Sequence, residues 1–358
     1  MAARRSAAVQ AALAQAAPGT PLREGLDRIV KAKMGALVVV GDGPEVLNIC
    51  SGGFLLDAVF SPQRLSELAK MDGAIILAAD ASRIARANVH LVPNPDVPTS
   101  ETGTRHRTAE RVARSIDVPV ISVSEDMGVI TVYAGPMKHV LEEIPRLLNR
   151  SNQALQTLER YKSRLDDVSS ALSSLEVEDL VTLRDVASVL QRNEMVRRIA
   201  EEIDGYIVQL GVDARLIRLQ LDELMGDVED DRYFVIEDYH YDGDERRSVD
   251  DALAELAALS TDELLDVRAV AATLHLPGGG ADLDHSLQPR GYRLLAKVPR
   301  LPGAIIDRLV EHFGGLQKLL AASVDDLQTV DGVGEARARS VREGLSRLAE
   351  SSILERYV

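Results

Sequence analysis

Between Arg146 and Asp204 the chain contains neither glycine nor proline. Within this stretch apolar residues recur at steps of three and four: Leu155, Leu158, Tyr161, Leu165, Val168, Leu172 and Leu175. This spacing places them on one face of a helix with a coiled-coil-like seam, and no helix-breaking residue interrupts it. The stretch predicts one long amphipathic helix or two stacked ones, and it separates a part before it from a part after it.

Charge follows the same division of the 358 residues. Residues 1–150 carry 17 Lys and Arg against 16 Asp and Glu, residues 151–285 carry 13 against 31, and residues 286–358 carry 11 against 9. The middle part should therefore repel anionic ligands, whereas the two ends can accept them. We expect three domains, over residues 1–145, 146–280 and 286–358.

The first part has the pattern of an α/β domain. Short apolar runs predict buried strands at 35–42, which Gly and Asp close, at 46–50 after the GDGP turn, and at 74–80, 118–124 and 128–133. Helical spacing is found over 21–33, and Ser61 is placed to cap a helix that has Pro62 at its first position. The proline-rich segment Leu91–Thr104 predicts a long loop, and loops of this length are usually functional.

The tripeptide Asp72-Gly73-Ala74 lies between a predicted helix and a predicted strand. A carboxylate at the mouth of a strand can bind a metal ion or accept a proton from a hydroxyl group. Gly73 lets a ligand approach the backbone closely. Taken by itself, however, the tripeptide is better explained by an ordinary turn aspartate.

A second motif, GTRHRTAE, begins at Gly103 and opens a predicted helix. Thr104 is a suitable N-cap, and free amides at a helix start attract phosphate. Arg105, His106 and Arg107 add three side-chain donors at the same positive pole, where like charges are unfavourable without an anion. We therefore favour phosphate binding over a solvated basic helix start.

Ser124 lies at the end of the predicted strand that follows this helix. In an open α/β sheet ligands lie at the carboxyl ends of strands, so Ser124 can reach a bound phosphate. A turn serine explains the position equally well. The pattern GxxxxGK[ST] occurs nowhere in the sequence, so the predicted phosphate site is not a P-loop.

The C-terminal part holds a third motif, TVDGVGEARA, which starts at Thr329 between two predicted helices. It resembles a helix-hairpin-helix, in which Gly332 and Gly334 expose backbone amides to a DNA phosphate, flanked by Arg337 and Arg339. The alternative is a helical hairpin that contacts protein. The C-terminal part, residues 286–358, carries a net charge of only +2. This charge predicts weak, salt-sensitive DNA binding.

Three further stretches carry no chemistry in this interpretation. Residues 276–291 have the composition of a flexible linker, and residues 227–247 are charge-rich and predict a solvated loop and helix face. Residues 298–314 look like a degenerate first copy of the hairpin, with Pro302-Gly303 in place of its glycine pair.

Three segments, SGGFLLDAVFSPQRLSELAKMDGAIIL, ANVHLVPNPDVPTSETGTRHRTAERVA and PVISVS, resemble the diadenylate cyclase domain. With its helical middle and its C-terminal hairpin, the whole chain is similar to the family of bacterial DNA integrity scanning proteins. The resemblance implies an α/β N-terminal domain with a mixed sheet flanked by helices. An all-α spine and a small all-α helix-hairpin-helix domain follow.

The same resemblance implies that two ATP molecules condense to cyclic di-3′,5′-AMP and two pyrophosphates, within a homo-octamer that serves a DNA damage checkpoint. It implies that Asp72 acts in catalysis with a divalent metal ion, Mg²⁺ or Mn²⁺. The residues that it implies around ATP are Gly73, Leu91, Thr104, Arg105, His106, Arg107 and Thr108. Because each chain has one copy of each motif and the product has two equivalent bonds, two identical sites should face each other.

Composition narrows the setting. No apolar run is long enough to span a membrane, and we read the Ala-rich start as a helix rather than a signal peptide. Cys50 is the only cysteine, which excludes a disulfide framework and a zinc site built on cysteines. We expect a cytoplasmic, nucleoid-associated protein that binds DNA, branched DNA in particular. A second hypothesis stays open: a scaffold that binds DNA structures and whose α/β domain only senses nucleotide.

Overall fold

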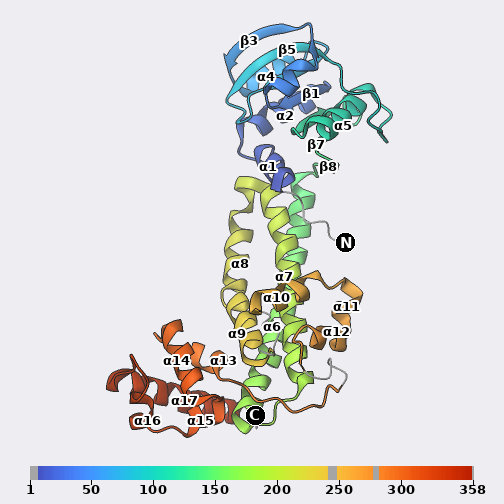
Figure 1. The fold of residues 1–358 in the computed structure, drawn as a ribbon. Helices are drawn as coiled ribbons and strands as arrows, with labels where there is room; N and C mark the ends of the chain where they lie inside the picture. The colour runs from blue at the N-terminus through green and yellow to red at the C-terminus, as the bar shows by residue number, and fades with distance from the viewer. Residues whose placement is uncertain (1–6, 241–247, 277–281, 357–358) are drawn as a thin grey trace. The chain divides into compact units, whose positions relative to one another are not determined.

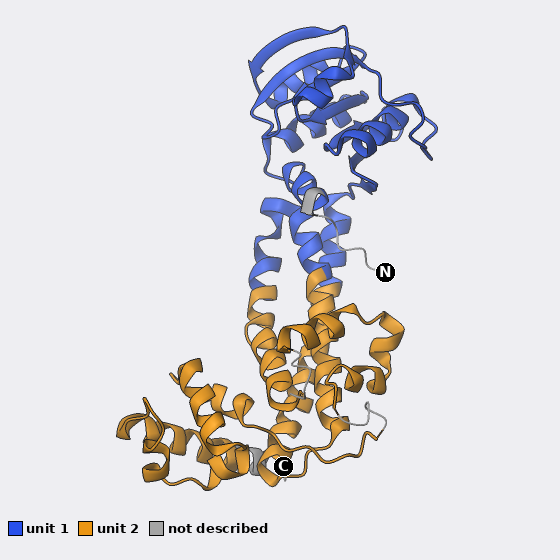
Figure 2. Ribbon diagram, viewed as in Figure 1, with its two compact units in different colours: residues 1–153, 202–220 blue, residues 154–201, 221–358 orange. Residues whose placement is uncertain are grey.

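The computed structural model describes residues 7–240, 248–276 and 282–356. The chain divides into two compact units, the first made of residues 1–153 and 202–220 and the second of residues 154–201 and 221–358 (Figure 2). The boundaries fall inside long helices instead of in loops. The three-domain division expected from composition stays a prediction.

The first unit contains a mixed sheet with eight strands in the described part of the chain. The strand order is β2-β5-β4-β1-β6-β7-β8. β3 pairs with β5 outside that path, and these two strands lie side by side in Figure 1. β1 and β4 are parallel and the other neighbours are antiparallel. The strands are β1 Ala36–Val40, β2 Cys50–Ser51, β3 Phe54–Val59, β4 Ala74–Leu77, β5 Arg83–Leu91, β6 Val120–Val123, β7 Ile130–Ala134 and β8 Met137–Val140.

Helices cover both faces of this sheet, which makes the predicted α/β class correct. Along β1, Val38 and Val40 pack with residues of α1, α2 and α4, whereas Leu37 and Val39 pack with residues of α5. All five residues of β1 are buried, as expected for a strand covered on both sides. The helices are α1 Ala7–Gln15, α2 Pro21–Lys31, α3 Pro44–Asn48, α4 Pro62–Leu68 and α5 Thr104–Ile116.

Two local predictions for this unit have opposite outcomes. Ser61 caps α4 as predicted, since its Oγ accepts a hydrogen bond from the Arg64 amide at 3.2 Å. The strand predicted at 46–50 is wrong, because Pro44 at a helix start directs the chain into α3. Strands β3, β5 and β8 were not predicted.

The stretch without glycine and proline forms two helices, α6 Ile144–Glu178 and α7 Leu183–Leu210. The helical conformation is interrupted between them at Asp179, whose backbone is left-handed with φ 58°. Four of the five leucines at the predicted seam, Leu155, Leu158, Leu165 and Leu172, are buried, whereas Leu175 is partly exposed. A short 3₁₀ helix, η1 Gly211–Ala214, leads into α8 Arg215–Met225.

The second unit is helical throughout its described part, as predicted. Residues of α13 to α17 build a separate hydrophobic core around Leu309, Leu319 and Val341. The remaining helices are α9 Val228–Tyr239, α10 Val249–Ala258, α11 Thr261–Leu265, α12 Val267–Ala272, α13 Tyr292–Ala296, α14 Gly303–Phe313, α15 Leu316–Ala321, α16 Val324–Gln328 and α17 Glu335–Arg356. None of the described helices is long and apolar enough to cross a membrane.

Two compositional predictions for this unit are wrong. The described part of the predicted linker, from residue 282 on, is bonded to the turn between α6 and α7: the Leu183 amide donates to the His285 carbonyl at 3.0 Å. The charge-rich run, described up to residue 240, is not simply solvated, because Arg232 and Asp238 are buried. Both segments find polar partners far away in the sequence, which composition does not reveal.

Candidate functional site

The predicted site residues of the first unit meet at one edge of the sheet. The amino ends of β1 and β4 and the carboxyl ends of β5 and β6 form this edge, as the strand registers show. The start of α5 joins it, because a Cβ added to Gly35, just before β1, would lie 2.1 Å from Arg105 Nη1. Four other predicted residues lie at this edge: Asp72, Gly73, Leu91 and Ser124.

Asp72 and Gly73 form the turn that enters β4. The Asp72 side chain is exposed and has no hydrogen-bond or ion-pair partner within the described part of the chain. Gly73 has φ 101°, and a Cβ there would lie 2.9 Å from the Asn88 carbonyl carbon and 3.0 Å from the Val89 nitrogen. Close approach of β5 thus explains Gly73, whether or not a ligand also approaches.

Leu91 ends β5 and is only 5% exposed. Its side chain packs into the core that lies between the sheet and α5. The Leu91 side chain therefore packs in the core beside the edge and is not part of the exposed surface of that edge.

The start of α5 differs in one respect from the sequence prediction. Gly103, not Thr104, is the N-cap, and no side chain caps the helix. Thr104 is the first helical residue, and the Arg107 amide is the first to bond within the helix, to the Gly103 carbonyl at 2.9 Å. The amides before it are free of a side-chain acceptor, which favours an anion at this pole.

The two arginines of this pole have weak partners or none. Arg107 is exposed and no described residue pairs with it. Arg105 has only Glu125, whose carboxylate lies 4.0 Å from Nη1 and is itself 62% exposed. An exposed pair at that distance contributes little, so both guanidinium groups can donate hydrogen bonds to phosphate oxygens.

His106 is half-buried, and its pKa is lowered below the usual histidine range mainly by loss of solvent. The negative charge of Glu101 opposes this shift, and the positive charges of Lys138 and Arg105 add to it. The imidazole is therefore mostly neutral at pH 7 until further negative charge arrives. Thr108, two residues on, is partly buried.

The loop of residues 92–103 is fastened to α5 by residues to which sequence reasoning gave no role. Glu110 is buried and accepts from Thr99 Oγ1 at 2.5 Å and from the Ser100 amide at 3.1 Å. Two arginines of α5 donate to loop carbonyls, Arg111 to Val97 and Arg114 to Pro98, each at 3.0 Å. Nothing in their sequence spacing marks these anchors, because their partners are loop groups ten or more residues away, most of them on the backbone.

Ser124 is 8% exposed and closes the turn between β6 and β7. Its Oγ accepts from the Met127 amide at 3.3 Å, and its amide donates to the Val129 carbonyl at 2.9 Å. This bonding gives Ser124 a structural role at the edge and leaves its hydroxyl proton available to an acceptor.

The hairpin of the second unit forms as predicted, between α16 and α17. Gly332 has φ 82°, and a Cβ there would meet Arg308 Nη1 at 2.8 Å, whereas a Cβ on Gly334 would meet no atom within 4 Å. Arg337 donates to the Gly332 carbonyl, and Arg339 pairs with Glu335. Both arginines are exposed, but each already has a partner on its own segment.

A groove of about 530 Å³ lies beside this hairpin. It runs between the start of α17, with Gly334 and Arg337, and the turn between α13 and α14, with Arg300. The degenerate first copy predicted over 298–314 thus places its turn opposite the second hairpin.

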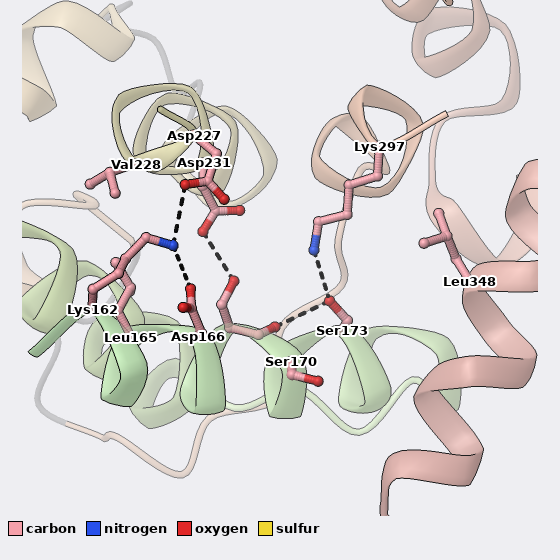
Figure 3. Close-up of a pocket in the computed structure, with 11 residues that line it drawn as sticks. Lys162, Leu165, Asp166, Ser170, Ser173, Asp227, Val228, Asp231, Lys297 and Leu348 are labelled. Carbon is pink, nitrogen blue, oxygen red and sulfur yellow. Dashed lines mark hydrogen bonds and ion pairs between the residues drawn. The ribbon is translucent and has the colours of Figure 1, made fainter. Parts of the chain in front are cut away.

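A smaller cavity of about 250 Å³ in the second unit lies at neither predicted site. Figure 3 shows Lys162 directed at Asp166 and Asp227, and Lys297 directed at Ser173. Its three carboxylates, Asp166, Asp227 and Asp231, outnumber its two lysines, so the cavity does not favour an anionic ligand. Within the described residues no group of three or more His, Cys, Asp or Glu side chains is arranged to hold a metal ion.

Comparison with known families covers most of the chain. Residues 23–137 match the family described as DisA bacterial checkpoint controller nucleotide-binding, and residues 141–283 match the DisA bacterial checkpoint controller linker region. Residues 315–344 match the helix-hairpin-helix motif. These ranges contain the sheet edge, the long helices and the hairpin, respectively.

Curated relatives match over nearly their full length. The DNA integrity scanning protein DisA of Streptomyces coelicolor is 60% identical over 352 residues, which are 98% of this chain and 94% of the relative. The protein of the same name from Acidothermus cellulolyticus is 61% identical, with coverage of 98% and 95%. Among solved structures, DacA from Staphylococcus aureus is 24% identical over 37% of this chain and 87% of its own, with a TM-score of 0.30.

Proposed function

The chain belongs to the family of DNA integrity scanning proteins DisA, and on this premise we propose that it is a diadenylate cyclase that also binds DNA. Two ATP molecules would condense to cyclic di-3′,5′-AMP and two pyrophosphates, and the C-terminal hairpins would bind DNA, branched DNA in particular. Occupancy by DNA would regulate the cyclase.

One observation carries the proposal: a carboxylate without a partner among the described residues, Asp72, shares one edge of the sheet with the guanidinium groups of Arg105, which has only a distant exposed partner, and Arg107, which has none in that part of the chain. Cyclisation joins the ribose 3′-oxygen of each ATP to the α-phosphorus of the other and breaks the α–β phosphoanhydride bond. Each attack releases the hydroxyl proton and one pyrophosphate. The reaction needs an acceptor for the hydroxyl and positive charge for the polyphosphate, which Asp72 and Arg105–Arg107 provide.

Asp72 also fits a divalent cation. Mg²⁺ is commonly bound by one or two carboxylates plus substrate phosphates, and the exposed Asp72 carboxylate has no competing cation in the described chain. We infer that Asp72 holds Mg²⁺ or Mn²⁺ together with ATP. The ion would neutralise phosphate charge, while Arg105, His106 and Arg107 bind the polyphosphate and Thr104 and Thr108 line the helix start.

The symmetry of the product supports a homo-oligomer, an octamer by family resemblance. Each chain has one such edge, so two chains must face each other to close both bonds. β3 supports self-association, because Phe54, Leu55 and Val59 are 57%, 75% and 72% exposed on a sheet. The proposed setting is the cytoplasm, at the nucleoid, where ATP and DNA meet.

The alternative is a DNA-binding scaffold whose α/β domain only senses nucleotide. It would bind ATP and DNA through the same residues but would not convert ATP to product. The experiment is incubation of the full-length chain with ATP and Mg²⁺ or Mn²⁺, with products separated by chromatography, with and without branched DNA. Cyclic di-AMP with two pyrophosphates per molecule is the expected result. Tight ATP binding without any product would support the scaffold instead.

A further inference from the structure

Glu101 is a nearly buried carboxylate beside the start of α5, and neither the motifs nor the proposed function gives it a role. It lies two residues before the N-cap Gly103, and its side chain is 13% exposed. A carboxylate with so little solvent needs partners, and their identity shows what it is built for.

The two partners of Glu101 come from neighbouring strands. Glu101 Oε1 accepts from Tyr133 Oη at 3.1 Å and lies 2.5 Å from Lys138 Nζ. Tyr133 on β7 and Lys138 on β8 are direct cross-strand neighbours, so the sheet presents both donors side by side. The pair holds the pKa of Glu101 below its usual range despite burial.

The backbone around Glu101 is also fixed. Its amide donates to Thr99 Oγ1 at 3.1 Å, and Thr99 in turn donates to the buried Glu110 of α5. The position of the carboxylate therefore depends on the sheet through Tyr133 and Lys138, and on the helix through Glu110. Such a double attachment orients a side chain, because neither the loop nor the carboxylate can move independently.

His106 lies within the electrostatic reach of this cluster. The charged groups that act on its imidazole are Glu101 from the loop, Lys138 from β8 and Arg105 from its own helix. Only Glu101 favours the protonated ring, whereas Lys138 and Arg105 oppose it. The His106 ring also lies over the N-cap, since a Cβ on Gly103 would lie 3.6 Å from Nδ1.

We propose that Glu101, clamped by Tyr133 and Lys138, is a positioning residue: it fixes the segment that leads into the glycine N-cap of α5 and places its negative charge on the side of that N-cap where His106 would meet the polyphosphate of ATP. This inference rests on the proposed function. Glu101 touches no substrate in this account. It supplies the one negative charge that prepares His106 to become a cation when phosphate arrives, and Lys138 limits that effect in the empty site.

The two members of the ion pair should therefore shift the pH dependence of nucleotide binding in opposite directions. Binding weakens as pH rises through the pKa of His106, since the neutral ring loses its attraction for phosphate. Glu101→Gln removes the negative charge and should move this midpoint about one unit lower. Lys138→Met leaves the Glu101 charge uncompensated and should move it higher by a similar amount.

The test is calorimetric titration of the full-length variants with 3′-deoxy-ATP, which lacks the attacking hydroxyl, between pH 5.5 and 8.5 (roughly the range in which histidine titrates). Glu24→Gln is the matched control, because Glu24 forms an exposed pair with Arg28 at 2.9 Å on α2. It should leave the midpoint unchanged. Glu101→Asp, which keeps the charge, should keep most of the normal profile.

Midpoints that move in opposite directions support the role of Glu101. Midpoints that do not move, or that move in the same direction in both variants, overturn it. A merely structural role would lower affinity at every pH without shifting the midpoint. If the wild-type chain does not bind 3′-deoxy-ATP at all, the proposed function itself fails, and the role of Glu101 fails with it.

Discussion

Arginines are placed in two opposite ways in the two units. At the start of α5, Arg107 has no partner in the described chain and Arg105 has only a distant, exposed one. Arg293 on α13 is 1% exposed, and its guanidinium donates to Glu176, to Ser173 and to the Ser169 carbonyl at 2.9–3.2 Å. Its own amide donates to the buried Asp238 at 2.9 Å.

Buried, fully paired charge such as that of Arg293 stabilises the fold, whereas more exposed, weakly paired charge such as that of Arg105 and Arg107 is available to a ligand. A saturated buried arginine can be removed only by leaving a buried carboxylate unpaired, so its loss is felt in folding. Unpaired arginines at a positive helix pole repel each other, so their loss is felt only in binding.

Asp72 belongs to the second kind and should show the largest effect. Asp72→Asn removes the charge at nearly constant size, so turnover of ATP should fall by about 10²–10⁴-fold. The free energy of unfolding should not fall, because the Asp72 side chain has no partner to lose among the residues that the structure describes. Product chromatography and thermal unfolding of the same preparation check both parts; near-normal turnover would remove Asp72 from the site.

Arg293 belongs to the first kind. Arg293→Met leaves Glu176, which is fully buried, without its cation, and should cost about 3–5 kcal/mol in unfolding free energy. Arg184→Met is the matched control, because Arg184 pairs with Asp284 while both are exposed, and it should cost less than about 1 kcal/mol. Equal costs for the two variants, measured by denaturant titration, would contradict the contrast.

The two glycines of the hairpin show the same contrast: Gly334 is open to a ligand, whereas Gly332 is needed by the fold. Gly334→Ala meets open space and should weaken DNA binding roughly tenfold or more, through loss of one amide–phosphate contact, with stability unchanged. Gly332→Ala should also destabilise the hairpin, because it meets Arg308 and forces a side chain into φ 82°.

Salt-dependent binding to branched DNA and thermal unfolding of both variants provide the measurement. These substitutions are more specific than deletion of residues 286–358, since that deletion also removes Arg293 and uncovers Glu176. If Gly334→Ala binds DNA normally at every salt concentration, the amide contact is not used.

Substitution of Asp238 should change the free energy of unfolding by a smaller amount, and this change should depend on pH. Burial and the nearby Glu176 carboxylate raise its pKa to about 7 from 3.8, against three backbone amides that lower it. Because the folded state holds the proton more tightly, this contribution to stability is present in acid and lost as pH rises from about 4 to about 7. Asp238→Asn should therefore gain stability relative to the wild type over that interval; a constant difference would contradict the shift.

The sequence alone was sufficient to predict the structure of a segment where residues within that segment determine its conformation. The absence of glycine and proline predicted α6 and α7, the Ser61-Pro62 pair predicted the start of α4, and the glycine pair predicted the hairpin. It was insufficient where distant segments decide. β3 has a left-handed Asp57 and a register shift against β5, so it shows no alternation of apolar residues.

The candidate site divides similarly. The motifs pointed to Asp72 and to the start of α5; the β1–β4 register and the closeness of Arg105 to Gly35 bring both to one edge. Glu101, Glu110 and Arg293 have no local pattern, because their partners lie on other elements or on the backbone. Their roles depend on the folded structure, which neither spacing nor composition encodes locally.

The most direct test of the contrast is a paired measurement on the double variant Arg105→Ala with Arg107→Ala. Affinity for 3′-deoxy-ATP should fall, since each charge-assisted hydrogen bond contributes about 1.5–3 kcal/mol. The free energy of unfolding should stay the same or rise, because repulsion at the α5 pole is relieved. A double variant that binds nucleotide normally, or that loses stability as Arg293→Met does, would contradict the account.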